Sequence, residues 1–201
     1  MKNNHIYIIS QNNNKKEELK KNINGLKIEF LGNNAEVILE EPIANFKNST
    51  ITLGDNSKFF IKSSHYEVSG IYMLLGYGCI CEIGHNFSVA GNTCILANSE
   101  NNLKIKIGDD CMFATNVILR ASDVHKIIDL KNGKRINSGQ YIEIGNHCWL
   151  AMNTTILKNV KIEDDCVIAA GSIVTKDCLQ KHTIIGGVPA KVIKKNVTWE
   201  R

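Results

Sequence analysis

The chain has 201 residues, of which 43% are hydrophobic, and this is enough for one domain with a substantial core. Its 24 basic and 20 acidic residues leave a net charge of +4, an excess too small to indicate a nucleic-acid-binding protein but suited to an anionic cofactor or acceptor. The first apolar run, residues 6–9, is too short for a signal peptide or a membrane span. The seven cysteines are odd in number, so we expect a cytoplasmic protein whose reduced cysteines serve in packing.

Residues 1–30 are predicted to form an N-terminal strand and cap segment. The chain is rich in Asn and Lys after the first strand, and residues 15–21 are expected to form one or two helical turns. From residue 31 onward, apolar residues begin to recur at every sixth position, which predicts a solenoid over residues 31–183.

The hexad repeat is clearest between residues 83 and 178. Reading one residue in six gives an apolar series: Ile83, Val89, Ile95, Ile107, Phe113, Leu119, Ile144, Leu150, Ile156, Ile162, Ile168 and Val174. Three places further on stand Asn86, Asn92, Asn98, Asp110, Asn116, Ser122, His147, Asn153, Asn159, Asp165, Gly171 and Asp177. Ten of these twelve are Asn, Asp or Gly, the types that best tolerate a left-handed backbone. A short strand and a turn in every hexad predict an all-β protein, a parallel β-helix in which three hexads close one triangular coil.

Two hexads depart from the turn pattern. In one, Ser122 and Asp123 stand at the turn, and in the other His147 stands there, followed by the bulky Trp149. His125 follows the first departure directly, at the start of an extended loop over residues 125–141. Because local rules fail most often at functional sites, we predict that His125 is a catalytic base rather than a solvated loop residue.

A family resemblance rests on four segments. Residues 122–137 and 144–158 resemble hexapeptide-repeat O-acetyltransferases that modify surface polysaccharides, most closely those acting on sialic acid-containing capsules. Residues 170–177 and 187–193 are similar to the tail of nearly all such acyltransferases. The resemblance covers about residues 83–199. It implies a left-handed β-helix, a homotrimer with active sites between neighbouring coils, and acetyl-CoA as the donor.

The resemblance also implies a reaction, which is direct transfer of the acetyl group to a hydroxyl of a bacterial surface glycan. A sugar hydroxyl is a weak nucleophile near neutral pH, and the imidazole of His125 is a suitable base. Asp123 is expected either to hold the ring in one tautomer or only to cap the turn. Trp149 is expected to position donor or acceptor, unless it serves in packing. Backbone N–H groups of residues 149–151 are expected to stabilise the oxyanion.

The expected cofactor-binding residues lie in the last hexads and the tail. They are Ala151, Lys158, Ala169, Gly171, Thr175, Lys176 and Lys191. The three lysines are expected to meet the CoA phosphates, unless they are ordinary solvated lysines. The pair Ala151–Met152 departs from the Gly-Arg or Gly-Ala often found after the Trp-aliphatic pair in the family, so the resemblance implies the reaction class but not the fine shape of the thioester pocket.

Two further segments complete the organisation. Residues 126–135 hold four basic side chains against one acidic side chain, Asp129, and this loop is either an electrostatic guide for a carboxylate-bearing polymer or simply solvated. Residues 184–201 are expected to form a tail that caps the open end of the solenoid.

Three other functions stay open from the sequence. N-acetylation of an amino-sugar nucleotide would use the same base and donor. A zinc hydro-lyase on this fold needs three His ligands, but His85, His125 and His147 recur at no short interval, so no metal site is expected. A non-catalytic β-helix scaffold would have no need of His125 and Trp149 at irregular hexads.

Overall fold

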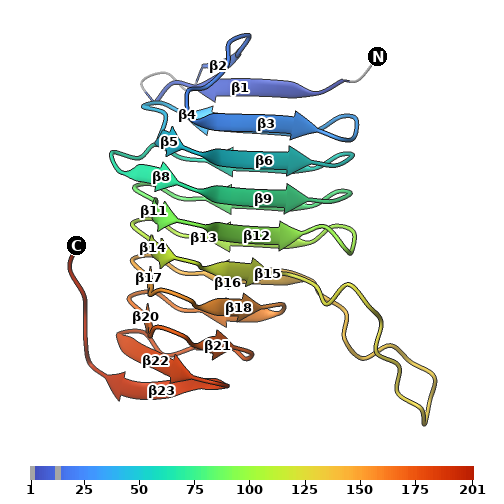
Figure 1. Ribbon diagram of the computed structural model, residues 1–201, viewed down its shortest axis with the longest axis vertical. Coiled ribbons are helices and arrows are strands. Elements are labelled where there is room, and N and C mark those ends of the chain that lie inside the picture. Colours follow the sequence, from blue (N-terminus) through green and yellow to red (C-terminus); the bar gives the residue numbers. More distant parts are fainter. Residues whose placement is uncertain (1–2, 12–14) are drawn as a thin grey trace.

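The computed structural model describes residues 3–11 and 15–201, and all of its regular elements are strands. Figure 1 shows them stacked as a column of coils with three flat sides. Sheet 1 consists, in spatial order, of β19 (Val160–Ile162), β16 (Tyr141–Ile144), β13 (Lys104–Ile107), β10 (Ile80–Ile83), β7 (Lys58–Ile61), β4 (Glu36–Glu40), β1 (His5–Ile9) and β2 (Lys16–Glu18).

The other two sides complete each coil. Sheet 2 consists of β23 (Ala190–Lys195), β22 (Thr183–Gly187), β20 (Val167–Ile168), β17 (Trp149–Leu150), β14 (Met112–Thr115), β11 (Ser88–Gly91), β8 (Glu67–Ser69) and β5 (Asn45–Lys47). Sheet 3 consists of β21 (Ile173–Val174), β18 (Thr155–Leu157), β15 (Ile118–Arg120), β12 (Thr93–Ala97), β9 (Ile71–Leu75), β6 (Ser49–Leu53) and β3 (Leu26–Phe30). From β4 to β21 the chain therefore passes from sheet 1 to sheet 2 to sheet 3 in each coil.

The core consists of the apolar hexad positions. Strands of successive coils pair in parallel, so these positions stack in columns such as Val89, Phe113 and Leu150 on sheet 2. Each of the twelve predicted interior residues is at most 3% exposed. The prediction of a parallel β-helix with a continuous apolar core is confirmed.

The corners take the backbone conformation that the hexads predict. A left-handed φ occurs at nine of the twelve turn positions, namely Asn86, Asn92, Asp110, Asn116, His147, Asn153, Asn159, Asp165 and Gly171. The expectation that His147 interrupts the turn pattern is wrong in backbone terms, since its φ is 51°. His147 instead keeps the same corner geometry as the Asn and Asp residues above and below it.

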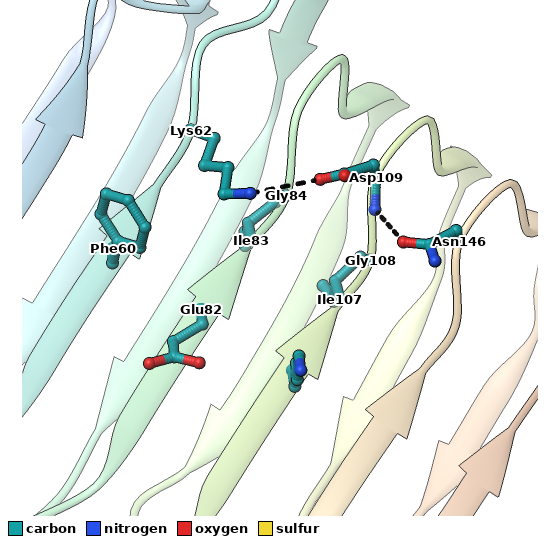
Figure 2. Close-up of a pocket in the computed structure, with 10 residues that line it drawn as sticks. Phe60, Lys62, Glu82, Ile83, Gly84, Ile107, Gly108, Asp109 and Asn146 are labelled. Atoms are coloured by element: carbon teal, nitrogen blue, oxygen red, sulfur yellow. Dashed lines mark hydrogen bonds and ion pairs between the residues drawn. The ribbon is translucent and has the colours of Figure 1, made fainter. Parts of the chain in front are cut away.

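The corner between sheets 1 and 2 is held by a ladder of side-chain oxygens. Asp109 Oδ1 accepts the His85 N–H at 2.8 Å, and Asn146 Oδ1 accepts the Asp109 N–H at 2.8 Å in the next coil. A Cβ at Gly108 would lie 2.6 Å from Asn146 Oδ1, so this approach requires glycine. Figure 2 shows the Asp109–Asn146 hydrogen bond of this ladder and the ion pair between Lys62 and Asp109, whose Nζ and Oδ1 lie 3.8 Å apart. These residues line a hollow of about 290 Å³. These groups bind one another, and we interpret the hollow as structural.

The two ends of the column differ from the middle. At the N-terminal end, β2 pairs antiparallel with β1, and the expected helical turn over residues 15–21 is wrong because Lys16–Glu18 is a strand. At the C-terminal end, β22 pairs antiparallel with β23. All seven cysteines are free, and burial raises the pKa of the Cys178 thiol to about 11, as expected for cysteines that serve in packing.

Candidate active site

The chain leaves the column after β15, at the corner between sheets 3 and 1. Residues 121–140 form a projecting arm, visible in Figure 1 on the side away from β17. At its base, the His125 N–H donates to the Asp123 carbonyl at 2.7 Å, and the intervening Val124 has a φ of 68°. A β-branched residue rarely adopts this conformation, which costs of the order of 1–3 kcal/mol. The strained turn between Asp123 and His125 is therefore the true irregularity of this hexad.

Three side chains at this turn form what we term the clamp: Asp123, Asn137 and Lys158. Lys158 Nζ donates to Asp123 Oδ2 at 2.5 Å, and Asn137 Nδ2 donates to the same oxygen at 2.9 Å. Asn137 Nδ2 also donates to the His125 carbonyl at 2.8 Å. The hydrogen bond from Lys158, with a smaller contribution from Asn137, lowers the pKa of the Asp123 carboxyl below its usual range.

A second ion pair fixes the arm to the neighbouring excursion of the coil. Arg135 donates through both terminal nitrogens to the two carboxylate oxygens of Glu100, at 2.8 and 2.9 Å. Its Nε donates to Asn137 Oδ1 at 3.1 Å, so this pair also braces the clamp. Arg135 is half-buried and paired, whereas Lys126, Lys131 and Lys134 of the arm are exposed.

The His125 ring is exposed, and none of the residues that the structure describes hydrogen-bonds to it. The Asp123 carboxylate binds Lys158 and Asn137 instead of the ring. Of the two roles considered for Asp123, this geometry favours holding the turn. The imidazole is thus presented to solvent on a braced backbone.

Trp149 lies on sheet 2, where its neighbour Leu150 points into the core and the indole therefore points outward. It borders a largely apolar groove of about 690 Å³ lined by Tyr66, Glu67, Ser88, Val89, Ala90, Met112, Phe113, Ala114, Trp149, Glu200 and Arg201. Trp149 Nε1 is buried and has no acceptor within residues 3–11 and 15–201. A buried donor without a partner is uncommon and marks a site of interest.

The prediction that the backbone N–H groups of residues 149–151 stabilise the oxyanion is wrong for two of the three groups. The backbone N–H of Trp149 donates to the Cys166 carbonyl, and that of Ala151 donates to the Ile168 carbonyl, both at 2.9 Å. These groups hold successive coils together and are not free to meet a substrate.

Sequence reasoning missed the C-terminal tail as part of this face. The Trp199 ring stacks on His147 with centroids 4.5 Å apart, and its Nε1 donates to the His147 carbonyl at 2.9 Å. It also lies 6.1 Å from the Trp149 ring. Beyond it, Arg201 lies 4.0 Å from the Tyr66 ring centroid. The only hint in the sequence was a Trp among the polar residues Thr198, Glu200 and Arg201.

The predicted site residues fall into two groups on different sides of the column. Lys158, Thr175 and Lys176 lie with His125 at the corner between sheets 3 and 1, since the pairing of Ile156 with Val174 places the latter two one coil away from Lys158. The other group lies on or next to sheet 2 with Trp149 and consists of Ala151, Ala169, Gly171 and Lys191. A single chain does not bring these two groups together.

The three lysines expected to bind phosphate differ in exposure and in ion pairing. Lys158 is paired with Asp123, whereas Lys176 and Lys191 are exposed and make no ion pair with any described residue. Over the described ranges, no three His, Cys, Asp or Glu side chains gather as a metal site, and no helix is long and apolar enough to cross a membrane.

Comparison with known proteins places the chain among acyltransferases. Residues 141–176 match the family model described as bacterial transferase hexapeptide (six repeats). The chain is 33% identical over 178 residues to a polysialic acid O-acetyltransferase of Neisseria meningitidis, covering 89% of this chain and 81% of the relative. It is 34% identical over 151 residues to a polysialic acid O-acetyltransferase of Escherichia coli O1:K1 / APEC, covering 75% of this chain and 45% of the relative.

Solved structures agree with this placement. The crystal structure of the polySia-specific acetyltransferase NeuO aligns with a TM-score of 0.82 at 29% identity, covering 99% of this chain and 86% of that one. The polysialic acid O-acetyltransferase OatWY aligns with a TM-score of 0.62 at 26% identity, covering 100% and 92%. The fold is thus the left-handed parallel β-helix of these enzymes, as the resemblance implied. The chain belongs to the hexapeptide-repeat O-acetyltransferase family.

Proposed function

We propose that the protein transfers the acetyl group of acetyl-CoA to a hydroxyl of a sialic acid-containing bacterial capsule glycan, in the cytoplasm. The observation that carries this proposal is the exposed imidazole of His125 on a strained, braced turn where the coil opens. The acceptor class is supported by similarity to polysialic acid O-acetyltransferases over most of the chain.

In the proposed reaction the acceptor oxygen attacks the thioester carbonyl carbon while its proton passes to the His125 imidazole. The carbon–sulfur bond then breaks, and the departing thiolate takes the proton from the imidazolium. The products are an acetyl ester and free CoA. General base catalysis of this kind typically contributes about 10²–10⁴-fold to the rate.

The donor is proposed to lie along the last coils. Lys176 and Lys191 are exposed cations without acidic partners among the described residues, so both can meet phosphate. Ala151, Ala169 and Gly171 are small residues that leave room beside Trp149 for the extended chain of CoA that carries the thioester. Thr175 lies next to Lys176. Lys158 is already paired with Asp123 and is therefore not proposed to meet phosphate.

The protein is proposed to form a trimer in which each complete active site lies between two neighbouring copies of the chain. His125 and Trp149 face different sides of the column, so one copy supplies the arm and its neighbour supplies sheet 2. The arm exposes Ile127, Ile136 and Leu130, the last 98% exposed, and the groove beside Trp149 is apolar. Such patches indicate an interaction surface, and a head-to-tail contact whose rotation closes after three copies gives the proposed trimer.

The acceptor is proposed to be drawn in by charge. Lys126, Lys131 and Lys134 are exposed on the arm and would attract a polymer that carries carboxylates. The test is release of thiol from acetyl-CoA with sialic acid oligomers, free sialic acid and neutral glycans. Release that depends on the sialic acid oligomers, with an alkali-labile ester as product, supports the proposal. An alkali-stable amide, or equal release with neutral glycans, would contradict it.

A further inference from the structure

The clamp at the base of the arm contains a half-buried cation that the reaction as proposed does not use. The Lys158 side chain is only 19% exposed, and its ammonium lies 2.5 Å from Asp123 Oδ2. Burying an ammonium is costly unless it is paired, and the Asp123 carboxylate supplies that pairing. Lys158 directly follows β18, and its ion pair with Asp123 therefore ties the base of the arm to a coil of the column.

The clamp determines where the His125 backbone lies. Asn137 is 6% exposed, and its amide nitrogen reaches both ends of the strained turn, the Asp123 carboxylate and the His125 carbonyl. A conformation such as that of Val124 persists only where the surroundings over-determine it. Asn137, with Asp123 held by Lys158, provides this restraint.

The clamp also sets the net charge of the turn that carries His125, because it pairs the Asp123 carboxylate with the Lys158 ammonium. An unpaired carboxylate near His125 would stabilise the imidazolium, so that less of the imidazole would be free to accept a proton at neutral pH. Lys158 neutralises that carboxylate. The other charged groups at this turn are Arg120, which also acts on Asp123, the neighbouring Lys126, and the mutually paired Arg135 and Glu100.

We propose that Lys158 and Asn137 are positioning residues for the His125 base: Asn137 holds the turn, and Lys158 holds Asp123 while cancelling its charge. This inference rests on the proposed function of His125. It differs from the expectation that Lys158 binds a CoA phosphate, and the two roles have different kinetic consequences. Loss of a phosphate contact raises the KM for acetyl-CoA, whereas loss of a charge-cancelling residue moves the pH profile.

The test compares Lys158→Met, Asp123→Asn and the double variant by the pH dependence of kcat/KM for the acceptor. In Lys158→Met, we expect the acid limb of the kcat/KM profile to move to higher pH by about half a unit or more, because the Asp123 carboxylate near His125 is then unpaired. The KM for acetyl-CoA should stay within about twofold of the wild-type value, since no phosphate contact is lost. The double variant should return the acid limb to the wild-type position. Lys158→Gln, which keeps a hydrogen-bond donor, should shift the limb in the same direction and serves if the Met variant does not fold.

Asn137 is tested by Asn137→Ala, for which we expect a fall in kcat of about tenfold or more with little change in the KM for acetyl-CoA. Exposed Asn132, at the far end of the arm, provides the matched control, and Asn132→Ala should retain wild-type kcat. A raised KM for acetyl-CoA with an unmoved acid limb in Lys158→Met would overturn the inference. His125→Ala separates the two proposals: if it is inactive while the clamp variants behave as wild type, only the inference fails, and if it is active, the proposed base fails as well.

Discussion

His125 and Trp149 lie on different sides of the column. His125 follows the corner between sheets 3 and 1, and Trp149 faces outward from sheet 2, the side that this corner does not touch. Strand β18 of sheet 3 separates this corner from the end of sheet 2, so a single chain does not bring the two side chains together. If both act on one acceptor, the site is formed between two copies.

This relationship predicts complementation between two inactive variants. His125→Ala and Trp149→Ala should each have little activity alone. Mixed trimers should recover activity, because an arm with intact His125 then meets a neighbour with intact Trp149, and random mixing gives about a quarter of such sites. The measurement is acceptor-dependent thiol release after co-expression. No recovery in mixed trimers would place both residues in the site of a single chain or remove Trp149 from it.

The corner geometry predicts an ordering of substitutions at Asn92. Its φ is 51°, which glycine adopts without cost and alanine does not. We expect Asn92→Ala to lower the free energy of unfolding by about 1–2 kcal/mol, and Asn92→Gly to lower it less. Urea unfolding of both variants provides the measurement. Equal losses would show that the side chain, and not the backbone conformation, matters at this corner.

The C-terminal tail is predicted to dock through Trp199. Truncation of a buried Trp to Ala typically costs about 3–5 kcal/mol, so Trp199→Ala should release the tail from His147. The chain has two Trp residues, and Trp149 is then the sole reporter. Its fluorescence should shift to longer wavelength in Trp199→Ala as the groove opens to water. Trp199→Phe also leaves Trp149 as the sole indole but keeps an aromatic ring, so it should emit at shorter wavelength than Trp199→Ala; equal emission maxima for the two variants would contradict tail docking.

The clamp predicts a specific dependence of stability on pH. The pKa of the Asp123 carboxyl is lowered in the folded protein by the hydrogen bond from Lys158. The stabilisation is therefore fully present above the ordinary carboxyl pKa, near 4, and is lost as the pH falls through the lowered value. The difference in urea midpoint between wild type and Asp123→Asn should be constant from about pH 5 to 8 and shrink below about pH 4. A difference that changes near neutral pH would point to another titrating group.

Most of the fold could be predicted because it is periodic. The interior positions and corners repeat every six residues, so each coil shows the same pattern of residue types. His147 shows the limit of residue type as a guide, since it adopts the left-handed corner that its identity does not suggest. The arm has no repeating pattern of its own, and its location could be predicted only from the interruption of the six-residue repeat.

The site was harder because its contacts cross long stretches of chain. Lys158 and Asp123 are 35 residues apart, and Arg135 and Glu100 are also 35 residues apart, with no shared spacing rule to signal either pair. Trp199 is 52 residues from the His147 carbonyl that it binds. Candidate residue types could thus be named from the sequence, whereas their partners could not.

The most direct measurement is acceptor-dependent thiol release from acetyl-CoA by His125→Ala, beside His65→Ala as an exposed histidine outside the arm. With sialic acid oligomers as acceptor, we expect His125→Ala to lose about 10²-fold or more in kcat and His65→Ala to match the wild type. Wild-type kcat in a folded His125→Ala variant would contradict the assignment of His125 as the base.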